Sequence, residues 1–270
     1  WHFRFDADAD MKMQAISDMI AADTSIQKIY LINQDYSFGH AVSNAAKSML
    51  PKKRPDVQIV GDDLHPLGKV KDFAPYIAKI RASGADSVIT GNWGADLALL
   101  VKAANDSGLD VDFYTYYAGI VGGPTAIGEA GVDRVKQVTQ WHVNVGDDKS
   151  DAIVESYRNK HPDLKDDVFF LTLKYAMDLL VQSINAAGST DPLSIAKQLE
   201  VGRYESLTGE VWMREDNHQL MQPLYVSTFK RMGEDGVKYD VEGTGVGPKT
   251  DFVVAAKDTA VATTCNMVRP

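Results

Sequence analysis

Helical and strand-like apolar patterns alternate along the first half of the chain. Apolar residues three and four positions apart favour helices, and runs of branched apolar residues favour strands. The successive helix and strand pairs are residues 13–20 with 26–32, 41–49 with 57–60, 73–80 with 87–90, and 97–104 with 111–115. Short connections between such elements specify a parallel sheet with helices on both faces. We therefore expect an α/β fold, a doubly wound parallel sheet, over residues 8–145.

Prolines, glycines and short polar side chains mark the expected ends of these elements. The second helix is expected to end before Pro51, because proline disrupts a helix interior. Asp72 is a candidate N-cap for the third helix, and Gly108 is expected to stop the fourth.

The second half of the chain has a different pattern. Residues 151–201 are predicted to be almost entirely helical, at 153–157, 168–187 and 192–199, the last after the candidate cap Asp191. Without neighbouring strands, these helices would leave apolar surface exposed. We expect a segment outside this numbering, another chain or another copy to cover them. Strand-like pattern returns at residues 224–230 and at the apolar stretch 253–256.

Two short motifs place aromatic residues directly after predicted strands. They are Gln34-Asp35-Tyr36-Ser37-Phe38-Gly39 and Thr90-Gly91-Asn92-Trp93-Gly94. In an open α/β sheet, small ligands bind where the carboxyl ends of strands meet the following helix N-termini. The sequence therefore points to binding. The alternative interpretation is that Trp93 packs at a helix start and that Phe38 is a hydrophobic staple.

Composition and the remaining motifs exclude other functions. A net charge of −9 argues against nucleic acid or an anionic membrane as the main partner. The lone Cys265 offers no disulfide framework or thiolate metal cluster. No nucleophile, base and orienting group can be assembled, so we expect no enzyme activity, no catalytic residue, no metal and no cofactor. The N-terminus lacks signal-peptide features, so any export signal is expected to have been removed already.

The order of motifs resembles the type I periplasmic solute-binding proteins of ABC transporters, in their leucine/isoleucine/valine-binding branch. The likeness is carried by Phe3-Arg4-Phe5, Asp35-Tyr36-Ser37-Phe38-Gly39-His40, Asp72-Phe73 with Gly84-Ala85-Asp86, and Leu207-Thr208-Gly209-Glu210-Val211 with Arg214-Glu215-Asp216-Asn217-His218. The resemblance implies two lobes joined by a hinge that closes on ligand. It implies a second, ligand-binding lobe at residues 6–144, the helical part of the first lobe and crossing segments at 145–215, and a return to the second lobe with the C-terminal tail at 216–270. The N-terminal segment of the first lobe is expected to be missing.

The resemblance also implies a ligand site. It assigns Phe38 and either Asn92 or Trp93 to aromatic positions that line the ligand, and Tyr117 to a third. The backbone at Gly39 and Ala118 is expected to offer amides to polar ligand groups. Tyr117 stands where amino-acid-binding members have a carboxylate for the ligand ammonium, and a phenol lacks that charge. An amino acid, an aromatic or other organic acid, and an amide-like solute therefore all remain open as ligands.

The function expected from this resemblance is an extracytoplasmic solute receptor of an ABC importer. Its expected partners are a small molecule, an inner-membrane permease and the missing first-lobe segment. Its expected location is the periplasm, free or lipid-anchored. The alternative is a ligand-sensing regulatory module of the same fold that acts on a partner protein.

Overall fold

The first half of the chain forms the predicted alternation of helices and strands, and residues 123–139 add two short helices and a strand that were not predicted. The computed structural model describes residues 1–169 and 171–269. The elements of this half are α1 (Ala9–Ala22), β1 (Lys28–Gln34), α2 (Ser37–Lys53), β2 (Gln58–His65), α3 (Ala74–Ser83), β3 (Ser87–Thr90), α4 (Gly94–Asp106), β4 (Asp112–Thr115), α5 (Gly123–Ile127), the 3-10 helix η1 (Gly128–Gly131) and β5 (Val135–Thr139).

The second half adds three helices, five strands and two more short 3-10 helices within the described residues. These are α6 (Asp148–Lys160), η2 (Leu164–Asp166), α7 (Thr172–Ala187), α8 (Pro192–Glu200), β6 (Arg203–Ser206), β7 (Gly209–Met213), β8 (Leu220–Met221), β9 (Leu224–Arg231), β10 (Val246–Val254) and η3 (Ala256–Thr259). Among the described residues, we find no helix with the length and apolar character needed to cross a bilayer.

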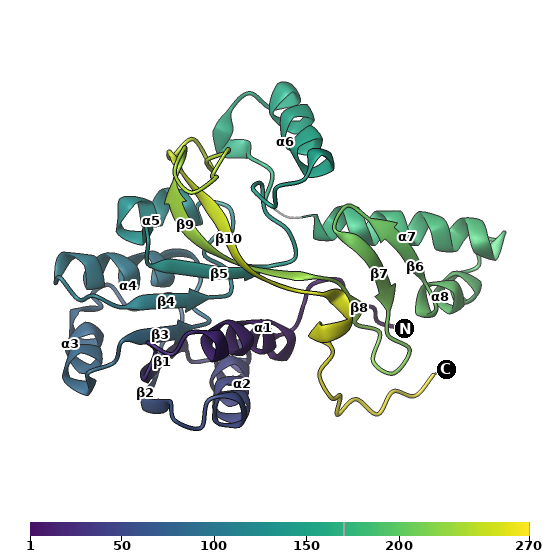
Figure 1. Ribbon diagram of the computed structural model, residues 1–270. Coiled ribbons are helices and arrows are strands. Elements are labelled where there is room, and N and C mark those ends of the chain that lie inside the picture. Colours follow the sequence, from purple (N-terminus) through teal and green to yellow (C-terminus); the bar gives the residue numbers. More distant parts are fainter. Residues whose placement is uncertain (170, 270) are drawn as a thin grey trace.

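A seven-stranded sheet forms the larger part of the molecule (Figure 1). Its strand order is β10-β9-β5-β4-β3-β1-β2. Strands β1 to β5 are parallel, β9 runs antiparallel beside β5, and β10 runs antiparallel beside β9. The tail thus extends the sheet with two long strands, of which the sequence pattern predicted β9 and only the end of β10. The mixed, mainly parallel sheet confirms the predicted fold class.

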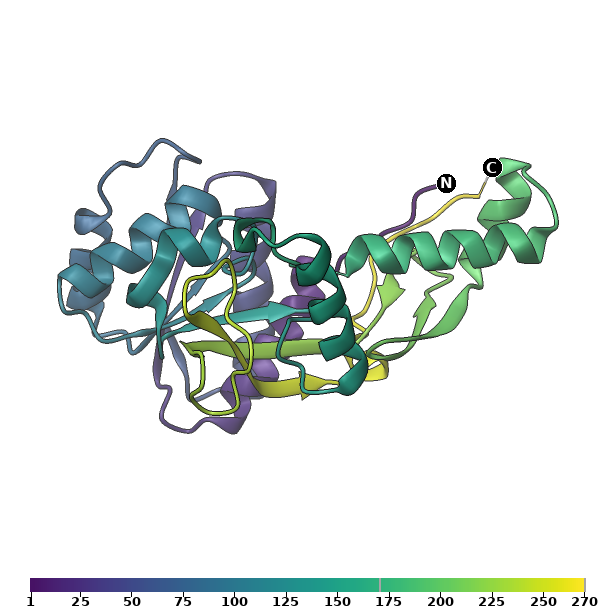
Figure 2. The ribbon, with the colours of Figure 1, turned by 90° about the horizontal axis from the view of Figure 1, so that it is seen from above.

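Helices cover both faces of this sheet, and side chains alternate between them. Ile29 and Leu31 pack with α1 and α2, whereas Tyr30 and Ile32 pack on the opposite face with α3, α4 and α5. Viewed from above, these two helical layers lie on either side of the strands (Figure 2). Because successive strand residues point to opposite faces, one buried strand can serve two cores. We call the seven-stranded sheet with α1 to α5 the sheet region.

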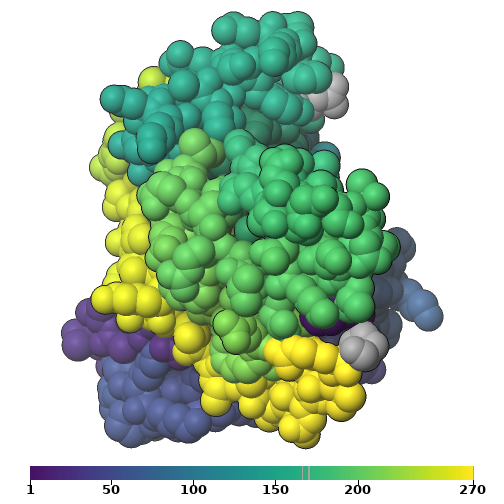
Figure 3. All heavy atoms as spheres, turned by 90° about the vertical axis from the view of Figure 1, so that its right-hand side faces the viewer, coloured from purple at the N-terminus to yellow at the C-terminus, as the bar shows by residue number. Residues whose placement is uncertain are grey.

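A second region contains α6, α7 and α8 with the three-stranded antiparallel sheet β6-β7-β8. We call it the helical region; its core includes Val154, Tyr175, Leu179 and Val211. The helices therefore do pack on strands, which come from residues 203–221 and were not predicted. Only part of α7 is covered, and its exposed apolar side chains are Leu173, Met177 and Val181. Figure 3 faces the helical region, with α6 at its top and the C-terminal tail below.

The N-terminal segment joins the two regions. The Arg4 amide donates to the His218 carbonyl at 2.8 Å, and the Leu220 amide donates to the Arg4 carbonyl at 2.8 Å. Arg4 and Gln219 form a parallel bridge. Two stretches more than 200 residues apart in sequence therefore lie side by side, and both chain ends lie beside the helical region (Figures 1 and 2).

Three predicted helix boundaries differ from the structure. Helix α7 begins at Thr172, although helix was predicted from residue 168. Helix α2 continues through Pro51 to Lys53, and the Arg54 amide then donates to the Leu50 carbonyl. Proline in the last turn removes a single donor, so the helix can continue past it. Helix α3 begins at Ala74 rather than directly after Asp72; the Asp72 carboxylate accepts the Ala74 amide at 2.8 Å.

Candidate functional site

The strand order creates a crevice at the carboxyl ends of β1 and β3. Strand β1 lies between β2 and β3, so the chain leaves β1 and β3 toward opposite faces of the sheet. Helix α2 packs on one face and helix α4 on the other. Such a switch point is where doubly wound sheets bind ligands, because two helix N-termini meet at one edge.

Four aromatic rings follow one another along this edge. We call Trp93, Tyr36, Phe38 and Tyr117 the aromatic row. The Trp93 indole nitrogen donates to the Tyr36 hydroxyl at 2.9 Å. The Tyr36 and Phe38 ring centroids are 6.1 Å apart, and those of Phe38 and Tyr117 are 5.5 Å apart. The structure thus brings Phe38, Trp93 and Tyr117 together, although Phe38 lies in the first turn of α2, Trp93 precedes α4 and Tyr117 follows β4.

Tyr36 is the member of the row that sequence reasoning did not select. It lies two residues before Phe38 in the same motif, and its hydroxyl links Trp93 to the rest of the row. A search for aromatic residues at helix starts would have found it, because Tyr36 is the residue directly before α2.

Glycines let the two loops approach each other. A Cβ atom on Gly39 would lie 1.9 Å from the Gln34 carbonyl oxygen, so only glycine permits this turn from β1 into α2. A Cβ atom on Gly91 would lie 2.8 Å from Val42 and 3.1 Å from the Phe38 ring. The Gly91 amide donates to the Asn33 side chain at 2.6 Å. These contacts fix the distance between the Phe38 and Trp93 loops.

Asn92 and Ala118 are buried and do not join the row with their side chains. The Asn92 amide nitrogen lies 2.8 Å from His65 Nε2, and its Oδ1 has no partner among the described residues. Ala118 packs in the core that contains α4. Any ligand contact by Ala118 is therefore expected from its backbone. The ligand roles of all six predicted residues, Phe38, Gly39, Asn92, Trp93, Tyr117 and Ala118, remain predictions.

A polar cluster lies at the Tyr117 end of the row. The Tyr117 hydroxyl donates to Asp6 Oδ2 at 3.1 Å, and Lys12 Nζ lies 3.3 Å from Asp6 Oδ1 and 4.1 Å from the Tyr117 ring centroid. The Gln140 amide also donates to Asp6. Burial, reinforced by Asp6, raises the pKa of Tyr117, so the phenol stays protonated and donates. Burial lowers the pKa of Lys12, and the Asp6 carboxylate opposes that lowering.

One feature of the sequence, a lysine among apolar residues, could have predicted this cluster. Lys12 stands between Met11 and Met13 in the apolar stripe of α1 and is 2% exposed. A buried lysine needs a nearby anion. The identity of that anion, Asp6, depends on the tertiary structure.

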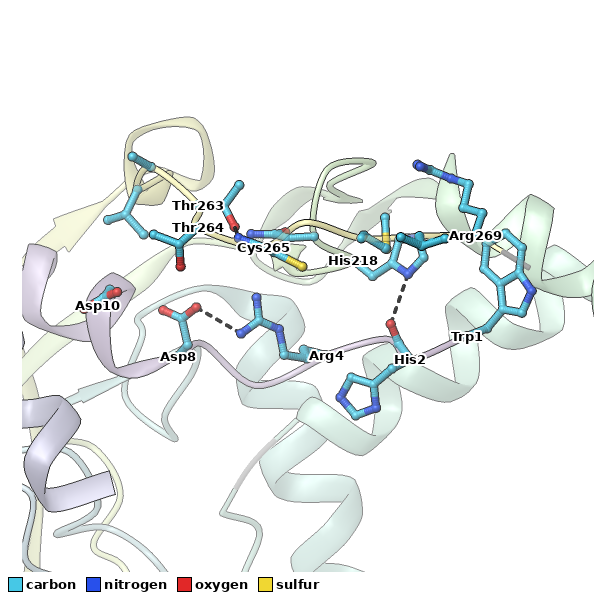
Figure 4. Close-up of a pocket in the computed structure, with 15 residues that line it drawn as sticks. Trp1, His2, Arg4, Asp8, Asp10, His218, Thr263, Thr264, Cys265 and Arg269 are labelled. Atoms are coloured by element: carbon cyan, nitrogen blue, oxygen red, sulfur yellow. Dashed lines mark hydrogen bonds and ion pairs between the residues drawn. The ribbon is translucent and has the colours of Figure 1, made fainter. Parts of the chain in front are cut away.

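A separate cavity of about 570 Å³ lies between the N-terminal segment and the C-terminal tail (Figure 4). Arg4 and Asp8 face the tail residues Thr264 and Cys265 across it, and Arg4 pairs with Asp8 at 3.3 Å. The predicted site residues do not line this cavity. Within the described part of the chain, no three His, Cys, Asp or Glu side chains gather as a metal site.

Comparison with known proteins identifies the family of the chain. Residues 1–236 match the family described as periplasmic binding protein. The chain is 30% identical to Leu/Ile/Val-binding protein homolog 4 of Brucella melitensis over 281 positions, which cover 100% of this chain and 65% of that relative. The chain thus spans about two thirds of the length of the curated relative that it matches.

Two solved structures are similar to this one. The leucine-, isoleucine-, valine-, threonine- and alanine-binding protein of Brucella ovis, in a closed conformation, has a TM-score of 0.87 and 26% identity, covering 100% of this chain and 69% of that one. A solute-binding protein of an ABC transporter from Rhodopseudomonas palustris, in complex with p-hydroxybenzoic acid, has a TM-score of 0.78 and 19% identity, covering 94% and 67%. At that identity the second shows the shared fold alone. Since the family match covers most of its length, the chain belongs to the periplasmic binding protein family.

Proposed function

We propose that this chain is the solute-binding receptor of an ABC importer, and that its aromatic row forms one wall of the ligand site. The observation that carries the proposal is the aromatic row at the switch point of the sheet. Flat rings at a crevice favour a ligand with an apolar or planar body. Trp93 keeps 39% of its surface exposed, although it is hydrogen bonded, so a ligand has a surface to cover.

The proposed mechanism is binding by hinge closure without chemical change. A ligand that contacts two lobes only in the closed state binds that state more tightly and shifts the population toward it. The pairing of the N-terminal segment with residues 218–220 supports these stretches as crossing segments between lobes. The domain limits 6–144, 145–215 and 216–270 belong to this proposal.

The exposed face of α7 supports a further part of the proposal, a first lobe completed by additional chain. Leu173, Met177 and Val181 are each about half exposed or more and lie on one helix. Exposed apolar stripes of this kind usually face a partner. We propose that a first-lobe segment beyond the present numbering covers them, as in a two-lobed receptor.

The proposed setting is extracytoplasmic, with a membrane permease as the receiving partner. Family membership supports this location and this partner. The relatives are named for leucine, isoleucine, valine, threonine and alanine, and the Rhodopseudomonas palustris structure holds p-hydroxybenzoic acid, so amino acids and aromatic acids are the ligands to test first.

Replacement of Trp93 by alanine tests the site. We expect binding of the ligand found in a panel of amino acids and aromatic acids to weaken by about 1–3 kcal/mol, because a buried aromatic contact is lost. Calorimetric titration measures this change. Thermal stability is expected to change little, since the Trp93 side chain is partly exposed.

Trp1→Ala is the matched control. Trp1 is 42% exposed, close to the 39% of Trp93, but lines the cavity beside the C-terminal tail. Unchanged affinity in Trp93→Ala together with weakened affinity in Trp1→Ala would move the ligand site to that cavity.

A further inference from the structure

Asp6 holds a carboxylate at the end of the aromatic row. Its oxygens accept from the Tyr117 hydroxyl, the Lys12 ammonium and the Gln140 amide. Asp6 comes from the N-terminal segment, whereas its partners come from α1, the loop after β4 and the stretch after β5. A carboxylate therefore lies one hydrogen bond away from the Tyr117 hydroxyl, at the end of the aromatic row.

The carboxylate has room for one more donor. A carboxylate offers about four acceptor positions, and three side chains donate to Asp6. The side chain of Asp6 is 44% exposed, whereas that of Lys12 is 3% exposed. A solute resting on the Phe38 and Tyr117 rings would consequently meet the anion of this pair and not its cation.

Lys12 is poorly placed to bind a ligand anion. Its ammonium lies 4.1 Å from the Tyr117 ring centroid and within 3.4 Å of both Asp6 oxygens. A ligand carboxylate would have to displace Asp6 or take a place beside it, and two adjacent carboxylates repel. Charge complementarity at this end of the row favours a cation.

We propose that Asp6 is a specificity-determining residue that binds the ammonium group of the solute, so the ligand class is a primary amine or amino acid with an apolar or aromatic body. This inference rests on the proposed receptor function. Lys12, Tyr117 and Gln140 position the carboxylate. The hydrogen bond from the Tyr117 hydroxyl connects the aromatic row to Asp6.

Three probes that share a phenylethyl group differ in the charged groups that they carry. 2-Phenylethylamine carries only the ammonium, 3-phenylpropanoate carries only the carboxylate, and L-phenylalanine carries both. Calorimetric titration of the protein with each probe is expected to give at least tenfold tighter binding of 2-phenylethylamine than of 3-phenylpropanoate. The reverse order would overturn the inference.

Two variants assign the preference to Asp6 without leaving a buried lysine unpaired. In Lys12→Met the Asp6 carboxylate keeps its Tyr117 and Gln140 donors and loses its neutralising charge, so 2-phenylethylamine is expected to bind at least threefold tighter. In the double variant Asp6→Asn with Lys12→Met, binding of that amine is expected to fall at least tenfold below that of Lys12→Met. Equal amine affinities in these two variants, or loss of 3-phenylpropanoate binding in Lys12→Met, would contradict the role of Asp6.

The outcomes also separate this inference from the receptor function. If a ligand of the wider panel binds in a manner sensitive to Trp93→Ala, but binds Lys12→Met and the double variant Asp6→Asn with Lys12→Met equally well, the receptor function stands and the role of Asp6 falls. If neither the three probes nor the panel of amino acids and aromatic acids binds, the proposed function itself fails, and the inference fails with it.

Discussion

The sheet region and the helical region bury their apolar side chains to different extents. In the sheet region, helices close both faces of seven strands, and residues such as Leu31, Ile89 and Leu100 have no exposed surface. In the helical region, three short strands cover one side of α7, while Leu173 on its other side is 74% exposed. The seven-stranded sheet is thus large enough to cover the apolar faces of its helices. The small antiparallel sheet covers only part of the apolar face of α7.

Within the sheet region, the aromatic residues of the core differ in exposure from those at the candidate site. Phe113 and Tyr114 are fully buried in the middle of the sheet, whereas Trp93 lies at its carboxyl edge with an exposed face. Rings within the sheet stabilise the core, and rings at the edge are available to a ligand.

The buried ion pair between Arg158 and Asp167 lies within the helical region, and its removal is expected to destabilise the protein more than the other substitutions below. Arg158 Nη2 lies 2.6 Å from Asp167 Oδ2, and the Asp167 side chain has no exposed surface. Arg158 also donates to the Asp240 carbonyl, between β9 and β10. Arg158→Met would leave a buried carboxylate without its cation and should lower the free energy of unfolding by about 3–5 kcal/mol, measured by urea denaturation.

Arg203→Met is the control for this prediction. Arg203 pairs with Glu210 at 3.2 Å on the β6-β7 hairpin, and both side chains are more than half exposed. Exposed pairs contribute at most about 1 kcal/mol. Equal losses in the two variants would show that burial of Asp167 is not the cause.

Two leucine substitutions measure the difference in coverage directly. Leu100 in α4 is fully buried, and Leu173 in α7 is 74% exposed. We expect Leu100→Ala to lower the unfolding free energy by about 2–5 kcal/mol and Leu173→Ala by less than about 0.5 kcal/mol. Chemical denaturation checks both values. A loss above roughly 1 kcal/mol for Leu173→Ala would mean that its face is covered in solution.

His142 should make stability depend on pH at the boundary of the two regions. Burial lowers the pKa of His142 to about 3. Its Nδ1 accepts the Asn144 amide at 3.1 Å, and its Nε2 lies 2.9 Å from the Thr250 hydroxyl. The unfolded chain binds a proton near pH 6.5, and the folded protein does so only near pH 3. The stabilisation of the folded state that comes from a neutral His142 is therefore complete above about pH 6.5. As the pH falls toward 3, the free energy of unfolding decreases by at most about 1.4 kcal/mol per pH unit.

The comparison of wild type with His142→Asn isolates this contribution. Unfolding free energies between pH 7 and pH 4 should fall less steeply in the variant, because one proton-uptake step is absent. Parallel slopes in the two proteins would contradict the assignment to His142.

Sequence periodicity predicted most elements of the sheet region and fewer of the helical region. Strand β3 was predicted with its observed limits, and the Asp191 cap of α8 is present, with its carboxylate accepting the Ser194 amide. Strands β5, β6, β7 and β8 were not predicted. Residues 203–206 mix exposed and buried positions, and residues 135–139 are all buried although Lys136 and Gln137 lie between Val135 and Val138. A buried strand that contains polar residues lacks a continuous apolar run, so the apolar pattern does not predict it.

The candidate site shows the same division. The motifs around Phe38 and Trp93 could be placed at strand ends from sequence, because each follows a branched apolar run. The direction of the Asn92 side chain toward His65 could not, since it depends on the position of β2 beside β1. Family resemblance carried by the same motifs is confirmed by the family match.

The sequence alone determined that the chain alternates helices with strands, that it belongs to the periplasmic binding proteins, and that aromatic residues follow β1, β3 and β4. These properties follow from local periodicity and short motifs, which need no distant partner. Tertiary structure alone decided that β9 and β10 extend the sheet beside β5, and that Asp6 meets Tyr117 across 111 residues of chain. Strand order and side-chain pairing at that separation depend on how the whole core packs, and no local pattern in the chain records them.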